Sequence, residues 1–305
     1  MMTDLGIVIV NWNTRDLLKK CLETVVASQG DFSCRVVVVD NASTDGSPDM
    51  VRQDFPQVEL IVSDKNGGFS YGNNLGLRAL GFTDSGQIAP DAPRYALLLN
   101  PDTELLPESL AQMVAFMDSR PEVGIAGPRL LLPDGSLDLA CRRSFPTPEV
   151  AFYHFSGLAR RFPDSPRFAR YNMTFVDEHQ ETEVDSVVGA YMQVRREAIA
   201  DAGLLDETFF MYGEDLDWAY RVKAAGWKVV YYPEVIVWHI KRAASRKSQK
   251  AQFEFYRAML IFYRKHFRTT TPLWLHSLVL VGLMAKGGRR LWGEIFRSPT
   301  PAHGG

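Results

Sequence analysis

Three acids within four residues form an unusual polar cluster in this chain of 305 residues. Glu214, Asp215 and Asp217 follow the aromatic-rich run Phe209–Tyr212. Such acids suit the first turn of a helix, where the helix dipole favours negative charge. A carboxylate beside aromatic side chains can also have a raised pKa and act as a general base. Asp215 shares a helix face with Trp218, so the cluster is a candidate for deprotonating a substrate.

Polar side chains also follow four apolar runs in the first third of the chain. In a parallel α/β sheet, ligands bind outside the carboxyl ends of the strands. One polar strand end is usually only a turn or a helix cap, but four on one edge indicate a polar ligand site. The segments are Asn11–Thr14, Asp40–Gly46, Asp64–Phe69 and Asn100–Asp102.

Asp102 has the sharpest chemistry of these positions. A carboxylate with a second polar side chain two residues earlier, here Asn100, can hold a divalent cation through oxygen ligands. Such an ion can neutralise a leaving phosphate. A lone His such as His239, which follows a later apolar run, is more often structural than a ligand. No Walker loop or G-x-G-x-x-G follows the first run, so P-loop and classical dinucleotide sites are weakly indicated.

The sequence around these residues alternates between short apolar runs, typical of strands, and segments with the spacing of helices. Apolar runs without polar alternation, separated by helical spacing, indicate a parallel sheet in an α/β layer fold. Four βα units fit a doubly wound sheet better than an eight-fold barrel. We expect strands at 5–10, 36–39, 60–62 and 95–99, and helices at 14–28, 69–80 and 107–118.

The second half of the chain is less regular. Residues 137–184 lack a clear period and are expected to form a mobile loop or a small helical insertion. Four arginines there could bind an acceptor diphosphate or form a solvated face, which we favour; they are Arg142, Arg143, Arg160 and Arg161. Beyond the insertion we expect strands at 186–194, 228–232 and 235–238, and helices at 214–225 and 248–267.

The net charge of −2 hides an asymmetry. Residues 241–305 hold 13 Lys and Arg and two acids, a net +11, whereas residues 1–240 carry −13. A basic tail favours an anionic partner such as lipid or polyphosphate. The apolar segment 273–285 is shorter than the roughly 20 residues of a spanning helix, so it lies at a membrane surface or packs on the domain. Three scattered cysteines and no basic leader indicate a cytoplasmic protein.

Several segments, taken together and in order, carry a resemblance to a known family. They are Ile7–Asn13 (IVIVNWN), Val39–Ser47 (VDNASTDGS), Asn66–Phe69 (NGGF) with Gly72–Asn74 (GNN), Leu99–Asp102 (LNPD), Gly189–Arg196 (GAYMQVRR) and Phe210–Asp217 (FMYGEDLD). The chain resembles the inverting family 2 glycosyltransferases of the GT-A fold, and within them the bacterial rhamnosyltransferase-like branch. The resemblance covers about residues 5–240.

The resemblance implies an α/β GT-A fold, with a mostly parallel sheet flanked by helices and a C-terminal helical tail. Residues 1–240 would form the transferase domain, with a donor-binding half at about 1–132 and an acceptor and catalytic half at about 133–240. Residues 241–305 would form a basic amphipathic tail that can contact a membrane surface.

The resemblance also assigns roles to residues. Asp215, paired with Glu214, would be the catalytic base, and Asp102 with His239 would bind the metal. Asn100 stands where the family's D-x-D motif has its first acid. The donor nucleotide would be bound by Asn11, Asn13, Asp40, Asn41, Asp45, Asn66, Gly68, Phe69, Asn74 and Asn100. The sugar and acceptor would lie by Gly189, Ala190 and Trp218.

The expected reaction is inverting transfer of a sugar, with rhamnose from dTDP-rhamnose favoured, in cell-surface polysaccharide synthesis. The expected cofactor is Mg²⁺ or Mn²⁺, and the acceptor is a saccharide, linked to polyprenyl diphosphate at the inner face of the cytoplasmic membrane. No nucleic acid is expected. The alternatives are a UDP-hexose-dependent family 2 transferase, a nucleotidyltransferase, and a non-catalytic carbohydrate- or nucleic-acid-binding protein.

Overall fold

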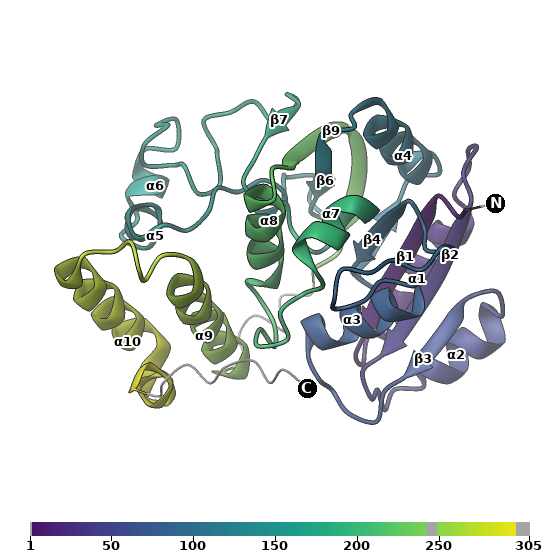
Figure 1. The fold of residues 1–305 in the computed structure, drawn as a ribbon, viewed down its shortest axis with the longest axis horizontal. Coiled ribbons are helices and arrows are strands. Elements are labelled where there is room, and N and C mark those ends of the chain that lie inside the picture. The colour runs from purple at the N-terminus through teal and green to yellow at the C-terminus, as the bar shows by residue number, and fades with distance from the viewer. Residues whose placement is uncertain (1, 242–248, 297–305) are drawn as a thin grey trace.

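A mixed sheet forms the centre of the molecule. The computed structural model describes residues 2–241 and 249–296, and within them nine strands join in the order β3-β2-β1-β4-β8-β6-β9-β5, with β7 beside β9 (Figure 1). The strands are β1 (Leu5–Asn11), β2 (Cys34–Asp40), β3 (Glu59–Val62), β4 (Tyr95–Leu99), β5 (Thr103–Leu105), β6 (Val123–Leu131), β7 (Thr182–Glu183), β8 (Tyr191–Arg195) and β9 (Lys228–His239).

The first four strands confirm the parallel α/β pattern. β3, β2, β1 and β4 are parallel neighbours, and helices follow them as the 3.6-residue spacing predicted. Because β1 and β2 are parallel and in register, Asn11 lies opposite Asp40 at their carboxyl ends. The helices of this half are α1 (Arg15–Val26), α2 (Ser47–Asp54), α3 (Phe69–Ala79) and α4 (Ser109–Ser119).

The other half of the sheet is mixed, which the sequence did not predict. β8 runs antiparallel to both β4 and β6, and it begins at Tyr191 because Gly189 and Ala190 form a turn. The two strands expected at 228–232 and 235–238 are one strand, β9, whose pairing with β6 shifts register opposite Pro128 and Arg129. β5 and β6 were not predicted.

Residues 137–184 form a helical insertion, one of the two alternatives expected. Thr147 caps its main helix by accepting a hydrogen bond from the Val150 amide. The expectation of a solvated arginine face is wrong for Arg142 and Arg143, whose side chains are buried, and right for the exposed Arg160 and Arg161. The helices are η1 (Leu139–Cys141), α5 (Pro148–Phe155) and α6 (Leu158–Arg161).

The C-terminal helices pack against the segment that holds the acidic cluster. Phe262 of α9 packs against Phe209 and Leu216, and His266 of α9 contacts the buried Asp217 at 2.7 Å. The helix that contains the apolar segment 273–285 extends to Phe296, with a break at Gly288. The helices are α7 (Arg196–Ala202), α8 (Glu214–Ala224), α9 (Gln249–His266) and α10 (Leu273–Phe296). The division at residue 240 stays a prediction.

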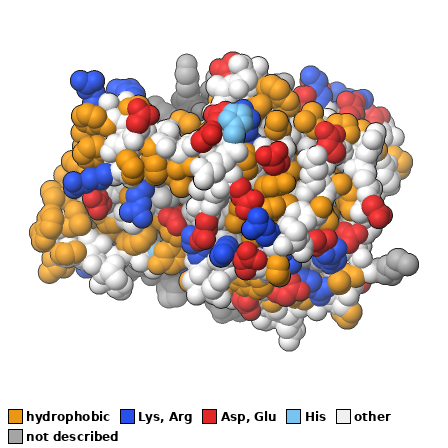
Figure 2. Space-filling view, turned by 90° about the horizontal axis from the view of Figure 1, so that it is seen from above, with side chains coloured by type: hydrophobic (Ala, Val, Ile, Leu, Met, Phe, Trp, Pro, Cys, Tyr) orange, Lys and Arg blue, Asp and Glu red, His pale blue; other side chains and the backbone are white. Residues whose placement is uncertain are grey.

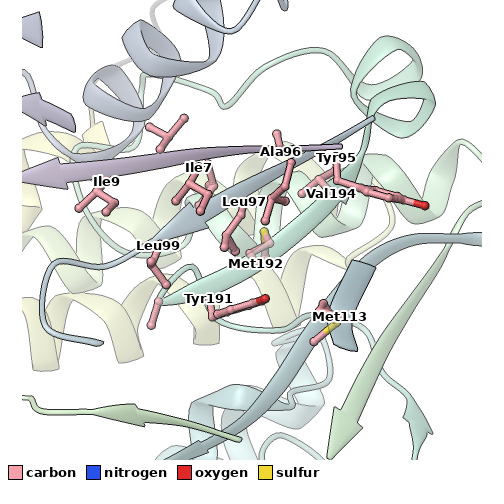
Figure 3. Packing of buried hydrophobic residues seen from close by; sticks show 14 of the residues in the cluster. Ile7, Ile9, Tyr95, Ala96, Leu97, Leu99, Met113, Tyr191, Met192 and Val194 are labelled. Carbon is pink, nitrogen blue, oxygen red and sulfur yellow. The ribbon is translucent and has the colours of Figure 1, made fainter. Parts of the chain in front are cut away.

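The main core lies along the sheet. Side chains of β1, β4 and β8 interlock in a fully buried layer, among them Ile7, Leu97 and Met192 (Figure 3). This rigid layer fixes the strand ends that carry the polar residues. None of the described helices has the length and apolar content needed to cross a membrane.

Candidate active site

A cavity of about 990 Å³ opens beside the carboxyl ends of β4 and β9. Its walls come from the strand ends, the insertion, the start of α8 and one face of α9. It brings together eight of the residues singled out by sequence: Phe69, Asn100, Asp102, Gly189, Ala190, Glu214, Asp215 and His239. The metal and base candidates therefore face one space.

Asp215 is held by three hydrogen-bond donors. Its Oδ2 accepts a bond of 2.6 Å from the Arg143 guanidinium and one of 3.0 Å from the Gly189 amide, while Oδ1 accepts from the Leu216 amide. Both side chains of the ion pair are less than a tenth exposed. Gly213, with φ 78°, provides the left-handed residue that starts α8 at this point. The carboxylate is fixed and its charge is balanced.

Arg143 is fixed in turn by the insertion. Its guanidinium also donates to the carbonyl of Val187 at 2.9 Å, and its backbone pairs with Ser186. Burial alone would lower the pKa of Arg143, but the charge interactions and hydrogen bonds with Asp215 and Tyr171 together raise it. Arg143 therefore stays positively charged beside Asp215.

Glu214 differs from its neighbour. Its side chain is buried, and among the described residues its Oε2 has no hydrogen-bond partner. Burial, reinforced by the negative charge of Asp215, raises the pKa of Glu214 to about 8. The pair therefore consists of one charge-balanced carboxylate and one carboxyl group that retains its proton at neutral pH.

A second cluster in the cavity wall surrounds His239. β5 and β9 pair Thr103 with His239, which brings His239 Nε2 to 3.3 Å from Asp102 Oδ1. His239 Nδ1 lies 2.9 Å from Asp138 Oδ2, and Lys241 lies 2.5 Å from the same carboxylate. Burial would lower the pKa of His239, but the bonds to Asp102 and Asp138 raise it.

Asp102 and His239 fit a divalent cation. They present one carboxylate and one imidazole nitrogen to the cavity, and a carboxylate that holds the other ring nitrogen is a common support for a metal-binding His. Within the described ranges, no group of three or more His, Cys, Asp or Glu could hold an ion. Oxygen atoms of a bound diphosphate would have to complete the coordination.

The ends of β1 and β2 form a buried polar network beside the cavity. Asn11 donates to Asp40 at 2.9 Å and to Ser43 at 3.1 Å, and Asp40 accepts from the Ser43 amide. Asn41 donates to the Gly68 carbonyl. Asn11, Asp40 and Asn41 are almost fully buried and are absent from the cavity lining, so their contact with a nucleotide stays a prediction.

Three other donor candidates lie in turns near these strand ends. Asn13 accepts from the Thr44 amide, Asp45 from the Arg15 amide, and Asn66 from the Gly68 amide. Asn13 and Asp45 line a separate hollow of about 260 Å³. A side chain at Gly68, where φ is 94°, would collide with the Phe210 carbonyl. Glycine at this position therefore allows the loop to pack closely against the segment before the acidic motif.

Two predicted contacts need correction. Trp218 is fully buried, and its Nε1 donates to the Gly203 carbonyl at 2.8 Å, so it packs the core instead of meeting an acceptor. Asn74 is equally buried and bonds to the backbone of Leu205, so it joins α3 to the chain before α8. Asp217, the third acid of the motif, is also structural, because Arg221 and His266 bind it.

The sequence did not identify three residues that bind the candidate base or support His239. Arg143 appeared only as one of several basic residues, while Asp138 and Lys241 were not selected. Their partners lie 72 residues away for the Arg143–Asp215 pair and 101 residues away for the His239–Asp138 pair. No local spacing carries such a signal.

The sequence matches a described family and curated relatives. The family "Glycosyltransferase like family 2" matches residues 3–257. The N-acetylglucosaminyl-diphospho-decaprenol L-rhamnosyltransferase of Mycobacterium tuberculosis H37Rv is 31% identical over 79% of this chain and 77% of its own length. The rhamnosyltransferase WbbL of Escherichia coli K12 is 24% identical over 74% of this chain and 80% of its own length.

Solved structures share the fold. GalNAc-T7, crystallised with UDP, GalNAc and Mn²⁺, has a TM-score of 0.58 at 14% identity, covering 86% of this chain and 50% of that one. The mannosyltransferase PcManGT of Pyrobaculum calidifontis, in complex with GDP-Man and Mn²⁺, has a TM-score of 0.58 at 16% identity, covering 99% and 77%. These matches confirm the GT-A fold, and with the family match they exclude the nucleotidyltransferase and non-catalytic alternatives.

Proposed function

Because the chain belongs to the family 2 glycosyltransferases, we propose that it transfers rhamnose from dTDP-rhamnose to a saccharide on polyprenyl diphosphate. The rhamnosyltransferase relatives support the sugar, and the name of the mycobacterial relative supports a lipid-linked acceptor. The reaction would supply cell-surface polysaccharide and take place at the inner face of the cytoplasmic membrane.

One observation carries this proposal: a single cavity holds both a pair of residues that fits a cation and a fixed carboxylate. Asp102 and His239 form the first group, and Asp215 with Arg143 forms the second. An inverting transfer needs these two functions, stabilisation of a leaving nucleoside diphosphate and activation of an acceptor hydroxyl. Gly189 and Phe69 line the same cavity.

In the proposed mechanism, Asp215 accepts the proton of the acceptor hydroxyl. The acceptor oxygen forms a bond to the anomeric carbon on the side opposite the diphosphate, and the bond from that carbon to the diphosphate oxygen breaks. Arg143 and the Gly189 amide hold the carboxylate in position. Glu214, which retains its proton, adds no second negative charge at the base. Positioned base catalysis typically contributes about 10²–10⁴-fold in rate.

In the same cavity, Asp102 and His239 would hold a divalent cation, Mg²⁺ or Mn²⁺. Asp138 keeps the imidazole oriented, with Nε2 toward Asp102. When bound, the cation supplies Lewis-acid stabilisation of the diphosphate that leaves. The neutral Asn100, two residues before Asp102, leaves the site with one carboxylate fewer than a D-x-D pair.

A transfer assay tests the proposal. The purified chain is incubated with Mn²⁺, radiolabelled dTDP-rhamnose and a short-chain polyprenyl-diphosphate N-acetylglucosamine. We expect a labelled lipid product, and NMR should show that the anomeric configuration is inverted. Transfer from UDP-hexoses alone would replace the donor assignment with the UDP-dependent alternative. A product with retained configuration would contradict the mechanism.

A further inference from the structure

The outer face of α10 carries exposed apolar side chains. Its inner face packs on α9, where Leu283, Leu291 and Ile295 join Leu260 in a buried cluster. Three outer residues lie on one stripe at positions i, i+4 and i+7: Trp274, Leu278 and Val281, each more than half exposed. A stripe of large apolar side chains facing water indicates a surface that meets a partner.

The insertion adds apolar side chains at the same end of the molecule. Phe152 is 62% exposed, and Phe162 is also exposed. Phe155 lies with its ring 6.5 Å from that of Phe255 on α9, so α5 and α10 both lie against α9. Figure 1 places α5, α6 and α10 at one end, and Figure 2 shows hydrophobic side chains gathered there with Lys and Arg among them.

Cations accompany this apolar surface. Lys286, Arg289 and Arg290 follow the stripe on α10 and are exposed, and Glu294 is the one acid in the α10 sequence. Arg160 and Arg161 of α6 are exposed as well. Apolar side chains flanked by cations are typical of a helix that lies in the interface of an anionic bilayer.

The other possible occupants fit less well. Segments 242–248 and 297–305 contain no Val, Leu, Ile, Met, Phe, Trp or Tyr, so neither offers large apolar side chains to cover the stripe. A second copy docking through the same patch would bring two sets of cations together, because a two-fold interface pairs a surface with itself. Anionic headgroups complement those cations.

We propose that the outer face of α10, together with the exposed phenylalanines of the insertion, docks the protein on an anionic phospholipid bilayer. α9 lines the catalytic cavity with Phe255 and Met259, and Met259 also packs against the buried cluster that joins α9 to α10. Docking through α10 therefore places the apolar wall of the cavity close to the bilayer. This last step rests on the proposed lipid-linked acceptor, whereas membrane docking itself does not.

Vesicle co-sedimentation of the full chain tests the surface. The vesicles contain phosphatidylcholine alone or mixed with phosphatidylglycerol. The apolar variant combines Trp274→Gln, Leu278→Gln and Val281→Gln, and the charge variant combines Lys286→Gln, Arg289→Gln and Arg290→Gln. The matched controls are Val62→Gln and Lys20→Gln, which change exposed residues of β3 and α1 at the other end of the molecule.

We expect the wild type and both controls to bind the phosphatidylglycerol vesicles. The apolar variant should lose binding, and the charge variant should weaken it roughly a hundredfold. Thermal melts confirm that each variant is folded. Equal binding by wild type and apolar variant, or a wild-type dimer in mass photometry that the apolar variant abolishes, would overturn the proposal.

A water-soluble acceptor separates this test from that of the proposed function. Transfer to a short-chain acceptor in detergent-free buffer should be the same in the wild type and the apolar variant, because no altered residue lines the cavity. If the wild type binds vesicles but transfers nothing, the rhamnosyltransferase assignment fails while docking stands. If it transfers sugar but ignores vesicles, docking fails alone.

Discussion

The ends of β1 and β2 and the acidic motif at the start of α8 use buried polar groups in different ways. At the ends of β1 and β2, Asn11, Asp40 and Ser43 bond to one another within one βαβ unit. Around the acidic motif, buried charges pair across long stretches of chain, as Arg143 does with Asp215. Glu214 beside them has an oxygen with no hydrogen-bond partner among the described residues.

This difference distinguishes polar groups that hold the fold from polar groups that can react. A buried amide network with its bonds made holds a loop in one shape. A buried charge lowers stability unless it is paired. Buried charges in the wall of a cavity therefore indicate a reactive group that the fold keeps at a cost in stability. We therefore expect changes around the acidic motif to alter turnover, and changes at the strand ends to alter mainly stability and donor binding.

The largest effect should come from Asp215→Asn. The amide cannot accept the hydroxyl proton, so kcat should fall by about 10²–10⁴-fold, while donor affinity in calorimetry stays within a few-fold. Asp217→Asn is the matched control, because that acid bonds Arg221 and His266 outside the cavity. It should lower stability and spare kcat. Near-normal turnover of Asp215→Asn would remove it as the base.

Arg143→Gln should come next. It leaves Asp215 buried without its counter-ion, which typically costs about 3–5 kcal/mol of unfolding free energy, and kcat should fall with it. Arg142→Gln is a control in the same insertion, because Arg142 is buried but bonds only backbone carbonyls of Val176 and Asp177. Denaturant melts and kcat of the folded fraction distinguish the two. Equal kcat in both variants would show that Arg143 only supports the fold.

Asn11→Ala should have a smaller effect, on stability and on KM for the donor instead of on kcat. Asp40 and Ser43 would each lose a donor, which costs about 1–3 kcal/mol, and KM for the donor should rise with kcat little changed. Asn66→Ala is the milder comparison, because Asn66 bonds the Gly68 amide in its own turn. A fall in kcat as steep as that of Asp215→Asn would erase the distinction between the two regions.

The smallest expected effect is a change of pH dependence in Glu214→Gln. The pKa of Glu214 is higher in the folded chain, about 8 against an ordinary 4.5, so the folded state binds its proton more tightly. Stability is then lost as the pH rises from about 4.5 to about 8. Glutamine removes this term, so the unfolding free energies from urea melts at pH 5 and pH 8 should differ less than in the wild type. Glu197→Gln, an exposed acid, should leave the difference unchanged.

Local pattern predicted the parallel half of the fold. β1, β2 and β4 are apolar on both faces and end in polar turns, so their sequence alone identifies them and their functional edge. β6 escaped notice because Gly124, Gly127 and Pro128 interrupt it. The break expected between the strands at 228–232 and 235–238 is only a register shift within β9.

Local sequence pattern likewise predicted part of the site. Asp102, Asp215 and His239 follow recognisable segments, and they do face one cavity. Arg143 and Asp138 could not be identified as partners, because tertiary packing alone brings them to Asp215 and His239. Trp218 shows the opposite error. Its spacing from Asp215 suggested a shared helix face and a place by the acceptor, but its side chain is buried in the core.

The most direct test of the central claim is donor binding with and without metal. Thermal unfolding is measured with dTDP-rhamnose, UDP-hexoses and free nucleotides, each with Mn²⁺, Mg²⁺ or EDTA, for the wild type and Asp102→Ala. A ligand at 100 times its Kd stabilises by about 2.7 kcal/mol. We predict metal-dependent stabilisation by dTDP-rhamnose that Asp102→Ala abolishes. No shift with any nucleotide sugar, or a shift that EDTA and Asp102→Ala leave intact, would contradict the account.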